Sequence, residues 1–318
     1  MQSNVSNYEE KEEVNLEQKG RKMEPVIPIY ALLTSIHGDY LESFAKMHDA
    51  GYRYVELLGM NYAENIRFSE QYPIQEVRRA MQEQGIIPVT AHERVENLDG
   101  FDWDGILKYY DALDCHCIVH PMIWIRTRED ALRLAEQLNR TGKYMRQRGF
   151  DYLLHTHHFE FRRLESGETL VDIIMENTDK EYLGFEYDVV WSMRAGIDPV
   201  AQLKKFGDRC FIIHQKDYNP AFPEPVNFFE TMEKLGLKDV PDMQAFVREH
   251  TGPDFFRVLG EGCVNIQEII QTAYDMGFVR YVVAESEMKT DRQFEIAKKE
   301  YEVLNTCILN AAKGGCER

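Results

Sequence analysis

Short apolar runs alternate with longer amphipathic stretches along most of the chain. Continuous runs of Val, Ile, Leu and Tyr are typical of strands buried on both faces of a parallel sheet, whereas apolar residues at helical spacing indicate surface helices. The predicted strands are residues 27–33, 52–58, 86–91, 115–119, 151–155, 183–188, 210–213 and 280–284. The predicted helices are residues 39–50, 74–84, 102–113, 129–148, 169–177, 199–206, 264–276 and 291–311. Eight strand-then-helix units favour an α/β fold, a single (β/α)8 TIM barrel, over an open sheet.

Two segments depart from this repeat. Residues 1–24 are polar and rich in charge, so we expect a flexible N-terminal tail in front of a barrel domain at residues 25–318. Residues 218–259 form an insertion between the seventh strand and its helix. A long loop after a barrel strand lies on the catalytic face, where it serves substrate recognition. Its phenylalanines, Phe222 among them, either line an aromatic site or pack the insertion onto the barrel.

The charge and cysteine content narrow the class of protein. Lys and Arg total 37 against 54 Asp and Glu, a formal net charge of -17, and such a surface repels nucleic acid. No apolar run approaches the roughly 20 residues that span a bilayer, so no membrane association is expected. The six cysteines lack the paired spacing of zinc ribbons, and no signal segment opens the sequence. We expect free thiols and a cytoplasmic location.

Four consecutive predicted strands end in groups that bind metals. His155, Asp188, His214 and Glu285 stand at the ends of strands five to eight. The chemistry of a TIM barrel sits at these carboxyl ends, so the four side chains are expected to converge. Two imidazoles and two carboxylates suit Mn2+, Zn2+, Co2+ or Fe2+ better than Ca2+ or Mg2+. A single histidine at a strand end is more often structural, but four ligand types in consecutive order predict a divalent-metal site, with Mn2+ expected.

Further polar residues near the strand ends are candidates for acid–base catalysis. His157 is the first candidate for the base, because strand alternation places it on the side of His155 if the strand continues; a supporting or loop histidine is the alternative. Glu160, His92 and Glu285 are the other catalytic candidates.

Substrate contacts and buried carboxylates complete the predicted site. The residues expected to contact substrate are His120, Lys216, Trp191, His37 and Phe222. Glu56 and Glu186 would point into the barrel as buried carboxylates behind the ligands.

The ordered motifs resemble a known family. The segments LLHTHHFEF, LGFEYDVVW followed by AGIDP, IIHQKD, LGEG and VVAESE resemble the xylose isomerase-like TIM barrels of the sugar phosphate isomerase and epimerase superfamily, from about Ile27 to Ala311. The resemblance implies that His155, Asp188, His214 and Glu285 are the metal ligands. One departure is that many ketose epimerases have Glu where His155 stands, and their pair of glutamates serves as acid and base.

Two enzyme classes fit this resemblance. A bound divalent ion would polarise a sugar carbonyl while a base removes the adjacent proton. The sequence resembles the catalytic subunits of bacterial C-glycoside deglycosidases, which are lyases that release an aromatic aglycone from a 3-oxo-C-glycoside together with a smaller β-rich partner subunit. A sugar isomerase or epimerase is the alternative. An endonuclease IV-like barrel would need a basic face, and a non-catalytic barrel would not need the ligand series.

Overall fold

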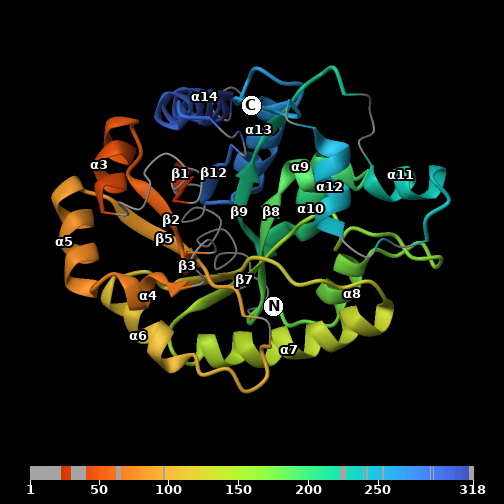
Figure 1. The fold of residues 1–318 in the computed structure, drawn as a ribbon, viewed down its shortest axis with the longest axis horizontal. Helices are drawn as coiled ribbons and strands as arrows, with labels where there is room; N and C mark the ends of the chain where they lie inside the picture. Colours follow the sequence, from red (N-terminus) through yellow and green to blue (C-terminus); the bar gives the residue numbers. More distant parts are fainter. Residues whose placement is uncertain are drawn as a thin grey trace, which may run out of the picture.

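Eight parallel strands close into a barrel in the computed structural model (Figure 1). The structure describes residues 23–29, 41–61, 66–95, 97–222, 227–238, 240, 243–252, 254–286, 288 and 290–314. The barrel strands are β1 Glu24–Pro28, β2 Tyr54–Leu58, β5 Ile87–His92, β6 Cys117–His120, β7 Asp151–His155, β8 Gly184–Asp188, β9 Cys210–Gln215 and β12 Tyr281–Ala284. They lie in the order β1, β12, β9, β8, β7, β6, β5, β2. The predicted (β/α)8 barrel is confirmed.

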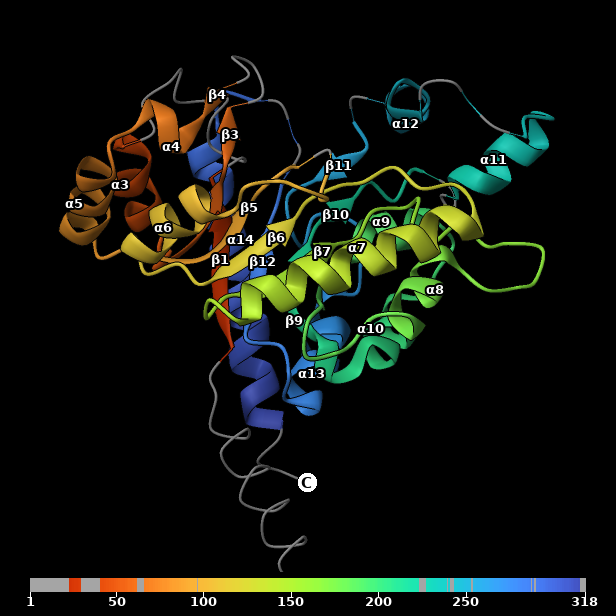
Figure 2. The ribbon, with the colours of Figure 1, turned by 90° about the horizontal axis from the view of Figure 1, so that it is seen from below.

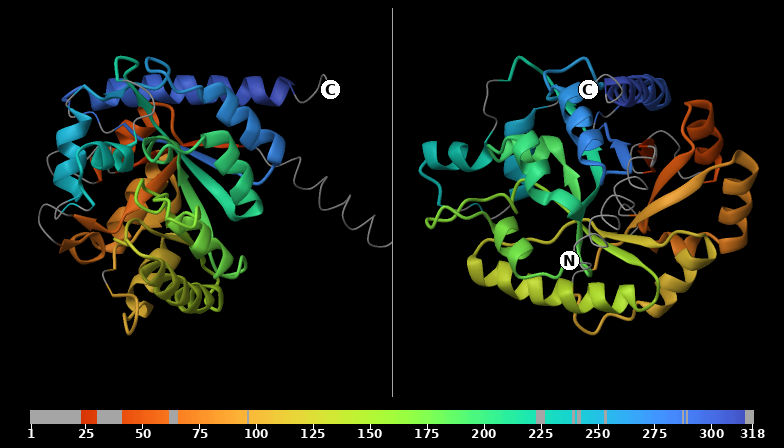
Figure 3. Two further views of the ribbon diagram at one scale, coloured as in Figure 1. Left: turned by 90° about the vertical axis from the view of Figure 1, so that its right-hand side faces the viewer. Right: turned by 180° about the vertical axis from the view of Figure 1, so that it is seen from behind.

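Helices surround the barrel on its outside (Figure 3). They are α3 Glu42–Asp49, α4 Phe68–Gln71, α5 Ile74–Gln84, α6 Asp104–Ala112, α7 Arg128–Arg146, α8 Leu170–Glu176, α9 Val189–Arg194, α10 Pro199–Phe206, α13 Ile266–Met276 and α14 Gln293–Gly314, besides a 3-10 turn at Gly207–Arg209. Local sequence sets several helix starts. Thr127 and Thr169 each form a capping box, and Asp198 caps α10 with Pro199 as its first residue.

The first strand differs from its prediction. It begins at Glu24, which pairs with Tyr281, and it ends at Pro28 rather than continuing to residue 33. Met23 before it is also buried. The strand therefore begins three residues before its predicted start at residue 27, because it includes the polar Glu24, which an apolar pattern does not detect. Residues 1–22 of the predicted tail lie outside the described residues.

The insertion after β9 forms a cap of its own. It contains β10 Asp217–Tyr218, α11 Phe228–Lys234, α12 Met243–Thr251 and β11 Phe256–Arg257, and β10 pairs with β11. Figure 2 shows these elements at the end of the barrel opposite the one toward which α14 runs. Asp217 fastens the cap, because its carboxylate accepts the backbone N–H groups of Gly260, Gly262 and Val264, each at 3.0 Å. A short β3–β4 ribbon, Met60–Asn61 with Ile66–Arg67, follows β2.

A small apolar layer inside the barrel supports the candidate site. Val26, Val119, Leu153, Ile212 and Val283 form a buried cluster separate from the main core. Three of them stand two positions before a predicted ligand: Leu153 before His155, Ile212 before His214, and Val283 before Glu285. Since side chains two apart share one side of a strand, the polar residues form the next layer above an apolar floor.

The substitution Gly262→Ala tests the contacts through which Asp217 holds the cap. A Cβ at Gly262 would lie 2.1 Å from Asp217 Oδ1 and 2.4 Å from the Tyr218 carbonyl oxygen, so the free energy of unfolding should fall by roughly 1–3 kcal/mol. Gly105→Ala is the matched control, because a Cβ there meets nothing within 4 Å and alanine favours a helix by up to about 1 kcal/mol. Thermal unfolding measures both, and equal melting temperatures for the two variants would contradict the packing described.

Candidate active site

Two carboxylates and one lysine lie together at the ends of β8, β9 and β12. Lys216 Nζ forms ion pairs with Asp188 and with Glu285, the latter at 2.9 Å. Asp188 is held from its other side, because its Oδ1 accepts the backbone N–H of Trp191 at the start of α9. Asp188 and Lys216 are buried, and Glu285 is half-buried. We call Asp188 and Glu285 the outer carboxylates. Their shared contact with one ammonium group indicates that a single cation can satisfy both.

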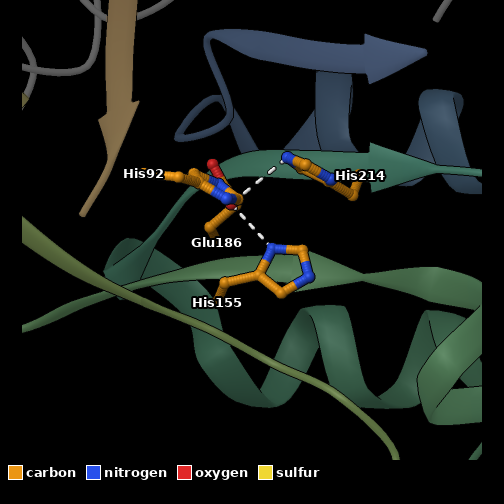
Figure 4. Close-up of side chains that lie close together, drawn as sticks. All are labelled: His92, His155, Glu186 and His214. Carbon is orange, nitrogen blue, oxygen red and sulfur yellow. Dashed lines mark hydrogen bonds and ion pairs between the residues drawn. The ribbon is translucent and has the colours of Figure 1, made fainter. Parts of the chain in front are cut away.

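A second group of charges lies among the same strands. Glu186 Oε2 lies 2.7 Å from His92 Nε2, 2.7 Å from His155 Nδ1 and 3.2 Å from His214 Nε2 (Figure 4). Glu56 Oε1 lies 3.2 Å from both His92 Nε2 and His214 Nε2. Thr90 donates a further hydrogen bond to Glu56 at 2.9 Å. We call Glu56, Glu186 and His92 the inner cluster.

His155 and His214 connect the inner cluster to the outer carboxylates. His155 turns Nδ1 to Glu186, while its Nε2 lies 3.9 Å from Asp188 Oδ2. His214 turns Nε2 to the inner cluster, while its Nδ1 lies 2.7 Å from Glu285 Oε2. Each imidazole therefore has one nitrogen toward each group. A hydrogen bond to one ring nitrogen fixes the other as the ligand atom of a metal-binding histidine.

The electrostatics of the inner cluster reflect this pairing. Burial alone would lower the pKa of His92, but Glu56 and Glu186 outweigh it and raise that pKa to about 10. Burial and Glu56 would raise the pKa of Glu186, but His214 and His92 lower it to about 2. The pKa of His155 is well below its usual value because of burial and the nearby His214. His155 is thus a neutral imidazole, the form that binds metals.

The predicted metal ligands fall into two overlapping groups. Ligand atoms of Asp188, His214 and Glu285 lie within 4.8 Å of one another. Those of His92, His155, Glu186 and His214 do so as well, and His155 approaches the first group only through its 3.9 Å contact with Asp188. The donor set of His155, Asp188, His214 and Glu285 still fits a divalent cation, because its four groups converge from neighbouring strands and two of them already share a positive charge.

His157 lies next to this ligand set although the strand does not reach it. β7 ends at His155, and His157 lies in the irregular segment between this strand and the turn at residues 158–161. Its ring centroid is nevertheless 4.7 Å from that of His155 and 6.0 Å from that of Trp191. Burial, with Lys216 nearby, holds the pKa of His157 well below its usual value. His157 is therefore unprotonated near neutral pH.

The other acid–base candidates have structural contacts. Glu160 accepts the backbone N–H of His157 at 2.8 Å, and burial raises the pKa of Glu160 to about 8. Its described bonds thus shape the loop that carries His157. His92 belongs to the inner cluster, where its ring stacks on His214 at 5.6 Å.

The predicted substrate contacts are spread over the site and the cap. The ring of Trp191 lies 5.5 Å from Lys216 Nζ, beside the outer carboxylates. His120 ends β6, and burial lowers its pKa to about 4. The described ring contact of Phe222 is with Phe255 of the cap, at 5.1 Å. His37 lies outside the described residues.

Two features of the site escaped the sequence prediction. One is the link between the inner cluster and both histidines: the inward alternation of Glu56 and Glu186 signalled buried carboxylates but not their partners. The other is a ring stack that starts at Trp124, on the loop between β6 and α7. A tryptophan in the loop after a predicted barrel strand was the available signal.

Comparisons with known proteins show the family. The model of the xylose isomerase-like TIM barrels matches residues 44–307, so this chain belongs to that family. An inosose dehydratase of Bacillus velezensis is 28% identical over 154 residues, which are 48% of this chain and 46% of that protein. The chain thus spans about half the length of the curated relatives it matches.

Solved structures show the same fold. A sugar phosphate isomerase/epimerase from Parabacteroides distasonis superposes with a TM-score of 0.66 and 20% identity, over 90% of this chain and 93% of that one. The IOLI protein with a bound zinc atom has a TM-score of 0.61 and 13% identity, over 92% and 99% of the two chains. No described helix is long and apolar enough to cross a membrane.

The ligand assignment is tested by His214→Ala and Glu285→Ala. Each variant should lose bound metal while the barrel still folds, because the core layers lie below the strand ends. Elemental analysis and circular dichroism measure the two properties. His116→Ala is the matched control, since it removes a half-exposed imidazole just before β6, at the other end of the barrel. Wild-type metal content in both test variants would contradict the assignment.

A second prediction concerns Glu186→Gln. The amide cannot neutralise His92 or hold His155 Nδ1 as a carboxylate does, so metal affinity should fall roughly 10–100-fold without loss of a direct ligand. Competition with a fluorescent chelator measures the affinity. Glu83→Gln, an exposed glutamate on α5, should bind as the wild type. An unchanged affinity in Glu186→Gln would show that the inner cluster does not orient the ligands.

Proposed function

We propose that this protein is a divalent-metal-dependent lyase that removes the proton next to a ring ketone and expels the group on the neighbouring carbon. One observation carries the proposal: His157 is the unprotonated imidazole whose ring adjoins His155 among the described residues, while the place of a second catalytic carboxylate is taken by His155, which is bonded to Glu186. One base suffices for elimination. Epimerisation must return a proton to the opposite face of the same carbon, which requires a second group.

The metal site we propose comprises His155 Nε2, Asp188, His214 Nδ1 and Glu285, with Mn2+ as the expected ion. A bound divalent cation would supply Lewis-acid polarisation of the ketone. Zn2+, Co2+ and Fe2+ suit the same mixed donors.

The remaining residues act on the substrate directly. His157 accepts the proton, because its depressed pKa keeps it neutral and its ring lies beside His155. Lys216, held between the outer carboxylates, would turn to a substrate hydroxyl once those carboxylates bind the cation. Trp191 forms a wall over Lys216 and His157.

The specific reaction we propose is C-glycoside deglycosidation. His157 takes the proton from the carbon between the ketone and the anomeric carbon, the bond from the anomeric carbon to the aryl ring breaks, and the aryl carbon takes up a proton. The products are the free aglycone and an unsaturated keto sugar, so no co-reactant is needed. A smaller β-rich partner subunit, as in the enzymes that the sequence resembles, stays a prediction.

The dehydratase names of several relatives support elimination as the reaction class. An inosose is a ring ketone of a polyol, and its dehydration expels water from the position where a C-glycoside would carry its aryl group. A sugar isomerase or epimerase is the alternative, supported by fold neighbours that include a D-psicose 3-epimerase from Clostridium cellulolyticum.

The test compares three substrates with the metal-loaded full-length protein: a 3-oxo-C-glucosyl flavonoid, an inosose, and a panel of free ketohexoses. We expect aglycone release that stops on chelation and returns with Mn2+. His157→Ala should abolish release but keep its metal, whereas His116→Ala should behave as the wild type. Conversion of the inosose alone would retain the lyase class and overturn the C-glycoside substrate. Interconversion of ketohexoses alone would overturn both.

A further inference from the structure

A stack of rings connects the candidate site with the surface. The ring centroid of His157 is 5.4 Å from that of Phe159, and the two planes differ by only 6°. The ring of Phe159 in turn stacks on Trp124, at 4.6 Å and 25°. Phe159 is buried, whereas Trp124 is 37% exposed. The series therefore begins beside the ligand His155 and ends in an indole that faces solvent.

The position of Trp124 places the indole at the mouth of the barrel. Trp124 lies in the loop between β6 and α7, and β6 pairs with β7, whose end carries His155. Loops after neighbouring parallel strands emerge side by side on the catalytic face. The loop is anchored at its far end, where Asp130 accepts the backbone N–H groups of Arg126 and Thr127, each at 3.1 Å.

The exposure of this residue requires an explanation. The exposed large apolar side chains among the described residues are Ile87, Trp124, Leu235, Leu237 and Leu309. Trp124 is the one aromatic residue in that group, and its ring is stacked toward the candidate site. An indole that stacks on one ring through one face can stack on a second aromatic ring through the other. Single exposed aliphatic side chains are common on protein surfaces and need no functional explanation.

Two phenylalanines in the described part of the cap, Phe228 and Phe255, do not provide an equivalent surface. Phe228 and Phe255 are fully buried, and both rings lie about 4 Å from the Arg194 guanidinium, at 4.0 Å and 3.9 Å. These phenylalanines pack the cap onto α9, which is the structural reading that the sequence left open. Neither of these two rings is therefore available to an aromatic group of a substrate.

We propose that Trp124, supported by Phe159, is the subsite that holds the aromatic group of the substrate. The inference rests on the proposed function, because an aromatic subsite serves catalysis only if the substrate carries an aryl group. It goes further by assigning the aryl group to the loop after β6 rather than to the cap, and by naming a planar aromatic ring as the chemical class bound. The stack thus links this subsite to His157, whose ring lies 5.4 Å from that of Phe159.

The experiment measures binding without turnover. Isothermal titration calorimetry with a free flavone and the full-length protein gives the dissociation constant for wild type, Trp124→Ala and Trp124→Phe. We expect about tenfold weaker binding in Trp124→Ala, the size of one lost aromatic contact, and near-wild-type binding in Trp124→Phe. Ile87→Ala is the matched control, because it removes an apolar side chain that is 40% exposed at the start of β5, at the opposite end of the barrel.

The outcomes separate this inference from the proposed reaction. Equal affinities in wild type and Trp124→Ala, or no flavone binding at all, would overturn the subsite. Weaker flavone binding in Trp124→Ala, with no release of aglycone from the 3-oxo-C-glycoside by the wild type, would uphold the aromatic subsite and overturn the proposed lyase reaction. Weaker binding together with aglycone release by the wild type would support both.

Discussion

The neutralisation of two glutamates inside the barrel is the constraint on which the site depends. Glu56 and Glu186 are buried above an apolar layer, where an unpaired carboxylate would be strongly disfavoured. Three imidazoles surround them: His92 and His214, whose pKa values are raised, supply positive charge, and the neutral His155 supplies a hydrogen bond. This pairing fixes the rings of His155 and His214, and so decides which of their nitrogens face the outer carboxylates. The metal site that we propose is thus a consequence of charge burial one layer below it.

Much of the architecture follows from local sequence patterns. The apolar runs predicted all eight barrel strands, and α5 and α10 have the bounds that their periodicity and their flanking Gly and Pro residues indicated. The four candidate ligands could be named from the sequence because parallel strands all end on one face. The bounds of β1 were harder to predict, because Glu24 joins the strand through its backbone pairing with β12 and carries no apolar side chain that would indicate a buried strand.

The partners within the site could not be predicted in the same way. Glu56 and Glu186 are 130 positions apart, and their common contacts with His92 and His214 depend on how the strands are aligned as the barrel closes. The same holds for the aromatic residues. Composition indicated the cap as a place for ring recognition and gave no sign of the loop after β6, because only packing separates the buried Phe228 from the exposed Trp124. Family membership likewise defines the fold, while the leaving group that we propose depends on such surface residues.

The central claim is that His155 and His214 direct one nitrogen each toward a cation held by the outer carboxylates. The most direct measurement is the anomalous scattering of Mn2+ in crystals of the metal-loaded protein. We predict one peak within coordination distance of Asp188, Glu285, His214 Nδ1 and His155 Nε2. A peak among His92, Glu186, His155 Nδ1 and His214 Nε2 instead would contradict the account, because the inner cluster would then be the metal site rather than its support.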